Sequence, residues 1–196
     1  MKYTKIPENT FQNIQLNAGV LLSSFTPSSA TVSEEAIIGA TTGGINFTAT
    51  PTYTDFGEDI DNCPKNMKEL KKLDSWEVKC SGTFVTIDTA AAKSLIGAAD
   101  IGTSDTTKVT ARNDLAQADF SDIWIVGDYS DKNGDTNGGF IAIHMMNALS
   151  TGGFQIKTAD KAKGQFAFEY TAHYSMSAQD TVPFELYIKA GTAEAG

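Results

Sequence analysis

Two stretches near the end of the chain alternate strictly between apolar and polar residues, and they cover residues 166–174 and 184–189. A period of two is typical of a strand that has one face in a core and the other face outside. Pro183 stands directly before the second stretch, where it suits the first residue of an edge strand. We expect the two strands to pair as a closing hairpin over residues 164–188. Because two strands cannot stand alone in water, the aromatic face of this hairpin needs further strands or a helix to cover it.

The same patterns predict further strands, at residues 45–50, 75–87, 108–111, 123–126, 140–149 and 154–157. Pro51 should end the first of them. In the second, the apolar phase changes after Gly82, which predicts a β-bulge at that glycine. The strand at 123–126 is apolar throughout, so we expect both of its faces to be buried.

One helix is predicted, over residues 89–99. Asp88 precedes it as a suitable N-cap, and Ala91, Leu95 and Ala98 recur on one face at helical spacing. Strands far outnumber this helix. The predicted fold class is therefore all-β with one α-helix, arranged as a β-sandwich or barrel.

The chain divides by composition into an N-terminal arm, residues 1–42, and a β domain, residues 43–196. The arm is rich in Ser, Thr, Asn and Gly, so we expect it to be disordered or to be ordered by another subunit. A long loop, residues 52–73, is inserted between two strands of the β domain. Loops of this length inside a compact domain usually have a function.

The charges in that loop are segregated along the sequence. An acidic group comes first and a basic group follows, and the residues are Asp55, Glu58, Asp59 and Asp61, then Lys65, Lys68, Lys71 and Lys72. The simplest interpretation is a solvated loop. The functional interpretation is a projection that contacts a neighbouring subunit through these eight residues.

The overall charge limits the partners. The 196-residue chain carries a formal net charge of −9, and Arg112 is its only arginine. A protein that reads nucleic acid needs a basic face and arginines, so this composition argues against DNA binding. The apolar run at residues 18–22 is too short for a signal peptide, and no stretch reaches transmembrane length, so we expect a protein made in a cytoplasm without membrane insertion.

Few residues carry recognisable chemistry. Cys63 and Cys80 are too few for a disulfide framework or a four-ligand zinc site. We expect Cys80 to be a buried free thiol, and a bridge between the two stays open as an alternative. The sequence contains no nucleophile-elbow or zinc-protease motif, and His144 and His173 are expected to be satisfied or surface histidines. We therefore expect no enzymatic activity and no cofactor.

A weak calcium candidate lies at Asp131, Asn133 and Asp135, whose alternating oxygen ligands imitate a calcium loop. An EF-hand would need glycine in place of Thr136 and a bidentate glutamate in place of Ala142. Two Asn-Gly steps in this region favour a plain hairpin turn instead.

The order of these pieces resembles the major tail tube proteins of bacteriophages, in their siphophage-like form. The matching motifs are diffuse and cover most of the chain from Gly43 onward. They are the Gly43-Gly44 strand start, Trp76-Glu77-Val78 with Gly82-Thr83, Phe120-Ser121-Asp122-Ile123-Trp124 with Gly127-Asp128-Tyr129, Gly139 to His144 with Asn147-Ala148, and Phe166 to Tyr174 with Val182-Pro183-Phe184-Glu185.

The resemblance implies a structural virion protein that is assembled in the cytoplasm of a bacterial host and ends up in the virion tail. Its subunits would form six-fold rings that stack into a tube, contact other tail proteins, and pair sheet edges around an acidic lumen. DNA would pass through that lumen without specific binding, because like charge repels phosphate. The alternatives are a capsid decoration protein and a carbohydrate- or calcium-binding β-sandwich module, which would need Trp76 or Trp124 as an exposed platform.

Overall fold

The computed structural model describes residues 5–7, 10, 14, 17–128 and 139–190. Within them the fold is antiparallel β structure with one α-helix, as the sequence predicted. The strands are β1 Val20–Leu22, β2 Thr41–Asp55, β3 Lys71–Phe84, β4 Ala99–Ile101, β5 Val109–Ala111, β6 Ser121–Asp128, β7 Phe140–Ser150, β8 Gln155–Lys157, β9 Gln165–Thr171 and β10 Phe184–Lys189. The helix is α1 Thr89–Ile96, and three short 3-10 helices are η2 Glu34–Ala36, η3 Lys68–Leu70 and η4 Gln117–Asp119.

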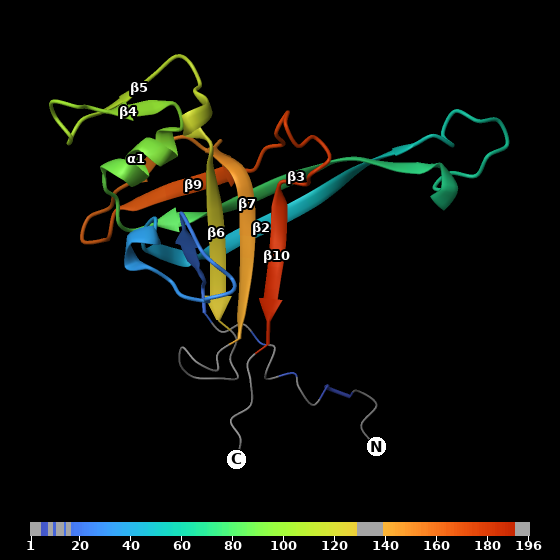
Figure 1. Ribbon diagram of the computed structural model, residues 1–196, viewed down its shortest axis with the longest axis horizontal. Coiled ribbons are helices and arrows are strands. Elements are labelled where there is room, and N and C mark those ends of the chain that lie inside the picture. Colours follow the sequence, from blue (N-terminus) through green and yellow to red (C-terminus); the bar gives the residue numbers. More distant parts are fainter. Residues whose placement is uncertain (1–4, 8–9, 11–13, 15–16, 129–138, 191–196) are drawn as a thin grey trace.

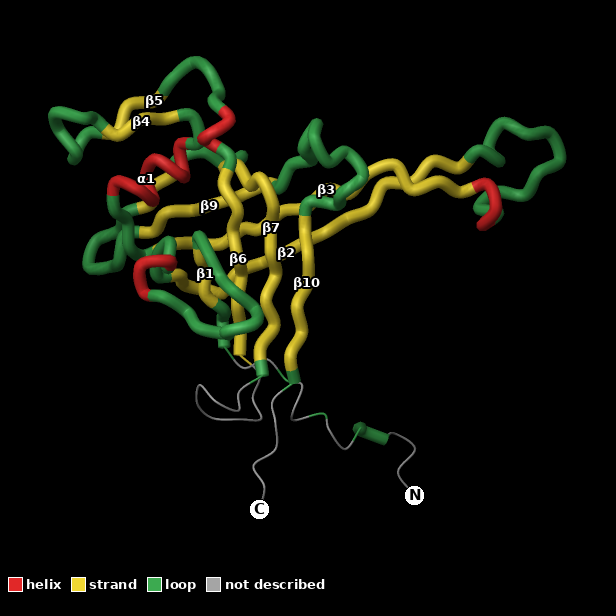
Figure 2. Tube along the Cα trace, viewed as in Figure 1, coloured by secondary structure: helices red, strands yellow, loops and turns green. Residues whose placement is uncertain are grey.

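Among the described residues, eight strands form one sheet that is folded into two layers. The hydrogen-bonded order is β1-β6-β7-β9-β3-β2, with β10 on β7 and β8 on β9. Strands β6, β7 and β10 run side by side across β9, β3 and β2 (Figures 1 and 2). Only the last residues of β7, Leu149 and Ser150, pair with β9 and join the layers. Crossed layers of this kind are one of the two common ways in which sheets pack face to face.

The core lies between the two layers. Phe166, Phe168 and Tyr170 on β9 share one buried cluster with Leu95 of α1 and with residues of the other strands, Val78, Cys80, Phe84, Ile123, Ile125 and Met145. This confirms the expectation that further strands or a helix cover the aromatic face of residues 166–170, and both do. Cys80 is buried here as a free thiol, as expected, and burial raises its pKa to about 12.

Gly82 does not change the alternation of its strand, and it is glycine because the Phe168 ring leaves no room for a Cβ. Val78, Cys80 and Phe84 all face the core, so the alternation of β3 continues through the glycine. The bulge lies on the partner strand β2, between Thr42 and Ile45. The prediction of a bulge at Gly82 was therefore wrong. The apparent phase change came from Val85 and Ile87, which lie beyond the end of β3 at Phe84. A Cβ at Gly82 would meet the Phe168 ring at 2.6 Å.

The N-terminal segment covers the other face of β6 and β7. Strand β1 pairs with β6, and Phe25 packs its ring on Trp124 and Phe140. The cluster also includes Leu22, Ala36, Val126 and Ala142. The expected boundary between an arm (1–42) and a β domain (43–196) stays a prediction. From Val20 to Ala36, however, this N-terminal arm packs on its own subunit, where we expected disorder or ordering by another subunit.

Helix α1 closes one end of the layers. Its N-cap Asp88 accepts a hydrogen bond from the Ala91 amide, as predicted. It ends at Ile96 because Gly97 adopts a φ of +83°, and Ala99 already belongs to β4. The helix is thus shorter than predicted. Ser94 on the helix forms a hydrogen bond with the buried Tyr170 hydroxyl, at 2.8 Å.

The expected closing hairpin does not form. Strand β9 pairs with β3, β7 and β8, whereas β10 pairs with β7 in the other layer. The alternation of residues 166–174 and 184–189 was interpreted correctly as strand structure, although β9 already ends at Thr171. Alternation carries no information on the pairing partner. Strands β6 and β7 do form an antiparallel pair. The calcium candidates Asp131, Asn133 and Asp135 in their connection lie outside the described residues.

Candidate subunit-contact surface

The most conspicuous feature of the molecule is a two-stranded ribbon that leaves the body. Strands β2 and β3 continue far past every other strand (Figure 1). Strand β9 pairs with β3 only over residues 79–84, so among the described residues no third strand pairs with the outer part of the ribbon. We call residues 50–75 the arm. Its length differs from the expected loop 52–73, because β2 runs through Pro51 to Asp55 and β3 begins at Lys71.

Pro51 is tolerated because it lies on a free edge. Trp76 is its partner across the ribbon. The Trp76 amide donates to the Tyr174 hydroxyl, on the side of β3 away from β2. Pro51 and Trp76 are therefore a pair without hydrogen bonds between them, and in such a pair the backbone N–H and C=O groups of both residues point away from the partner strand. The Pro51 nitrogen thus faces solvent, at a position where an added strand would need an N–H donor. Proline therefore blocks strand addition at this point of the β2 edge.

The arm has a polar face and an apolar face. Phe47, Ala49 and Trp76 pack against the core, and period-two alternation puts Pro51 and Tyr53 on the same side of β2. A register shift at Asp74 turns Leu73 to face Tyr53. The opposite side carries polar residues, namely Thr50, Thr52, Thr54, Asp74, Ser75 and Glu77. The arm is therefore amphipathic, and its apolar side continues the core-facing side of the sheet.

That apolar side is open to solvent. Tyr53 is 53% exposed and Leu73 is 44% exposed, and the tip of the arm adds the exposed side chains Phe56, Ile60 and Met67. We call Pro51, Tyr53 and Leu73 the arm stripe. Sequence reasoning missed it, because it treated 52–73 as a polar loop. The sequence did hold a signal for it. Tyr53 and Leu73 are apolar residues at the two ends of the expected loop, where they could have been interpreted as continuing the flanking strands.

The tip of the arm is a turn that several hydrogen bonds hold in place. Both carboxylate oxygens of Asp55 accept backbone hydrogen bonds, from Gly57 at 2.9 Å and from Asn66 at 2.8 Å. These bonds, first the one from Gly57 and then the one from Asn66, lower the pKa of Asp55. Lys71 donates to the Asn66 side chain and lies over the Tyr53 ring. Asp55 and Lys71 therefore hold the arm together.

The remaining candidate contact residues lie on the surface of the tip. Lys65 pairs with Glu58 at 3.6 Å, and both side chains are exposed. Lys68 pairs with its neighbour Glu69. Asp59, Asp61 and Lys72 are exposed and enter no ion pair within the described part of the chain. The segregation of charge along the sequence thus becomes partial neutralisation in space, because the hairpin brings the acidic and the basic half together.

A second apolar surface is open on β10 and β7. Leu186 and Ile188 are 51% and 61% exposed, and they pair with Ile143 and Ile141 of β7. Alternation places them on the side of β10 that carries Phe184, which packs its ring on Phe47 and Trp76 in the core. We call Ile141, Leu186 and Ile188 the β7–β10 patch. This patch extends the layer of β6, β7 and β10 beyond the core.

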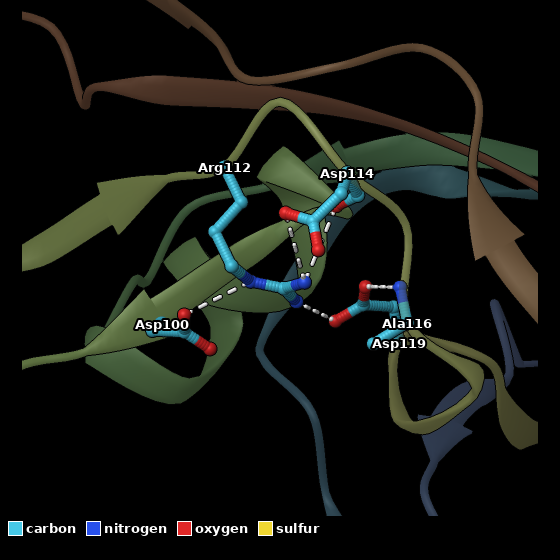
Figure 3. Close-up of polar contacts among 5 residues, drawn as sticks. All are labelled: Asp100, Arg112, Asp114, Ala116 and Asp119. Carbon is cyan, nitrogen blue, oxygen red and sulfur yellow. Dashed lines mark hydrogen bonds and ion pairs between the residues drawn. The ribbon is translucent and has the colours of Figure 1, made fainter.

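The only arginine is bound internally. Arg112 follows β5, at the opposite end of the molecule from the arm (Figure 1). Its Nη2 pairs with Asp119 at 2.5 Å and its Nη1 donates to the Asp114 carbonyl oxygen at 3.2 Å (Figure 3). Its Nε lies 2.9 Å from Asp100 without hydrogen-bond alignment. The guanidinium therefore fastens the β4–β5 hairpin to the following loop.

Asp119 receives a second bond in this cluster. The Ala116 amide donates to it at 2.8 Å. That bond, followed by the bond from Arg112, lowers the pKa of Asp119, although burial acts in the opposite direction.

The other chemical candidates have structural surroundings. His144 stacks on Trp124 with ring centroids 4.1 Å apart and contacts Asp122 at 3.1 Å. His173 contacts the Asn147 carbonyl oxygen. Among the described residues, no group of three or more His, Cys, Asp or Glu side chains is placed to hold a metal ion. Cys63 is free as well as Cys80, so no Cys63–Cys80 disulfide forms.

Compared with known proteins, the chain matches no family model and no curated protein. In the described part of the chain, no helix has the length and apolar character needed to cross a membrane.

Proposed function

We propose that this chain is the repeating subunit of a homo-oligomeric tube, and that it serves as a tail tube protein of a bacteriophage. Its six-fold rings would stack into the virion tail after synthesis in the bacterial cytoplasm, contact other tail proteins, and form a conduit for DNA. The observation that carries this proposal is the arm. It is an amphipathic ribbon whose apolar side has no covering partner within the described residues of its own chain.

The physical reason is the weakness of an isolated ribbon. Two strands without a third strand or a packed face are marginally stable in water. Exposed apolar side chains such as Tyr53, Phe56 and Leu73 also favour association. A second subunit that covers the arm would supply the missing packing, and many such contacts would add up in a repeated assembly.

The charge distribution supports a conduit for DNA. The net charge is −9 and the only arginine is bound by aspartates. Phosphate groups would therefore be repelled by the wall and find no bidentate partner.

The sandwich-type binding module has less support. Trp124 is 8% exposed, because Phe25 and His144 cover its ring. Trp76 is partly buried against Phe184. Neither tryptophan offers the open platform that a carbohydrate site needs. A capsid decoration protein is the closer alternative, because it also assembles through exposed surfaces.

The test is the assembly state of the purified full chain. Size-exclusion chromatography with light scattering and negative-stain microscopy should show rings and stacked tubes with a continuous lumen. A closed trimer or small oligomer without stacking would favour the decoration protein. A monomer at every concentration would refute the tube.

A further inference from the structure

The arm stripe and the β7–β10 patch are two ends of one packing surface. Inside the molecule, the apolar side of β2 and β3 packs on the apolar side of β6, β7 and β10. Phe184 marks the limit of this core, where it contacts Phe47 and Trp76.

Beyond Phe184 the two layers separate. The ribbon β2–β3 leaves the body sideways, whereas β10 and β7 continue in their own direction (Figure 1). The arm stripe therefore extends one side of the core, and the β7–β10 patch extends the side that faces it. Because the layers diverge, these two extensions cannot cover each other within one chain.

A second copy can supply the missing half on each side. The residue types on both surfaces, Tyr, Leu and Ile, are those of the core that they continue. Pro51 closes the edge of β2 to strand addition, so the arm has to bind through its apolar face. Face-to-face packing of two β layers is the geometry that this protein already uses for its own core.

We propose that the arm stripe of one copy packs on the β7–β10 patch of a second copy. The proposal rests on the proposed function, since it names the surface that receives the arm in the assembly. The two surfaces differ, so the contact is head-to-tail, and such contacts repeat until they close a ring or extend a filament. Each copy gives one arm and receives one arm.

The test is cross-linking between single-cysteine positions, in a background that carries Cys63→Ser. Cys80 stays, because it is buried and its pKa of about 12 keeps it protonated and unreactive. A Tyr53→Cys chain and a Leu186→Cys chain are prepared separately and joined with a short bismaleimide. A mixture should give cross-linked dimers, whereas each variant alone should stay uncross-linked. One chain with both substitutions should give a ladder of higher oligomers.

A second pair, Leu73→Cys with Ile188→Cys, guards against poor geometry at the first. Ser104→Cys, in the exposed turn between β4 and β5, replaces the arm cysteine as the control and should give no product with Leu186→Cys. Cross-linking of Tyr53→Cys with itself would show an arm-to-arm contact and overturn the proposal.

The failure of the two proposals can be told apart. If native chains form rings but neither cysteine pair cross-links, the receiving surface is wrong and the tube survives. If native chains remain monomeric, both proposals fail. Leu186→Asp should reduce the assembled fraction at least tenfold with an unchanged circular dichroism spectrum. Ile156→Asp, at a position 56% exposed on β8, should leave assembly unchanged, and an equal loss for both would contradict the assignment.

Discussion

At the scale of single residues, Gly82 is a position where a neighbouring aromatic ring leaves no space for a side chain. The Phe168 ring lies over this glycine and stacks on Phe84 with centroids 4.3 Å apart. A Cβ would meet two atoms of the ring below 3.0 Å. Phe84 and Tyr170 flank the ring, so its movement away from an added Cβ would disturb their packing.

We predict that Gly82→Ala lowers the free energy of unfolding by about 1–3 kcal/mol, as overpacking does in close-packed cores. Gly164→Ala is the control, because its Cβ would make an ordinary contact with Phe166 at 3.9 Å. Urea denaturation measures both. Phe168→Ala alone should cost about 3–5 kcal/mol. In that background Gly82→Ala should cost much less, and full additivity would refute the steric explanation.

Asp119 couples stability to pH. Its pKa is lower in the folded chain than the ordinary value of 3.8, because the Ala116 amide and then Arg112 bind the carboxylate. A lowered folded pKa gives stability that is fully present above the ordinary pKa. That contribution is lost as the pH falls through the folded pKa.

We therefore predict that acidification from about pH 5 towards pH 2 destabilises the native chain more steeply than Asp119→Asn, since the variant has no proton to take up there. Thermal unfolding at successive pH values measures the difference. Asp160→Asn, at an exposed position, controls for the loss of one charge. Parallel acid curves for the native chain and Asp119→Asn would contradict the role of this carboxylate.

At the scale of elements, the arm is separable from the core. None of the buried core residues lies between positions 50 and 75. Thr52 and Ser75 face each other across the ribbon, next to the pair of Pro51 and Trp76 whose backbone groups point outward. Thr52 and Ser75 therefore form a hydrogen-bonded pair, which a two-residue turn can close.

We predict that replacing residues 53–74 by Asn-Gly leaves a folded monomer whose melting temperature changes by only a few degrees. The same chain should lose the ability to form rings or tubes, because it lacks the arm stripe and the tip. Calorimetry and negative-stain microscopy check the two outcomes separately. Unfolding of the shortened chain would place the arm in the core, and normal tubes would make it a bystander.

At the scale of the whole molecule, the prediction concerns charge. A chain of net charge −9 with its arginine held by Asp100, Asp114 and Asp119 should not retain duplex DNA. We expect no mobility shift for the assembled protein at about 100 mM salt, near the physiological range of screening. A shift that weakens as salt rises would show a basic surface and refute an acidic wall.

Local pattern alone determined much of this protein. Period-two alternation located β9 and the apolar run at 123–126 located β6, each with shifted ends. Asp88 located the start of the helix. These features depend only on neighbouring residues. The burial of Phe166, Phe168 and Tyr170 followed from the same pattern. Net charge and the single arginine led to the expectation of no DNA binding without reference to any fold.

The tertiary structure decided what pairs with what. Alternation made β9 and β10 look like one hairpin, but pairing depends on long-range packing, and the two strands lie in different layers. Pro51 signals a strand end in sequence, yet it is accepted where its missing donor faces solvent.

Only the fold separates Phe184, which reaches the core, from Leu186 and Ile188, which have the same pattern and stay exposed. An apolar side chain in a strand indicates that its face of the sheet is to be covered. Whether the same chain or another copy covers it depends on where the layers diverge, and that is a property of the whole arrangement of strands.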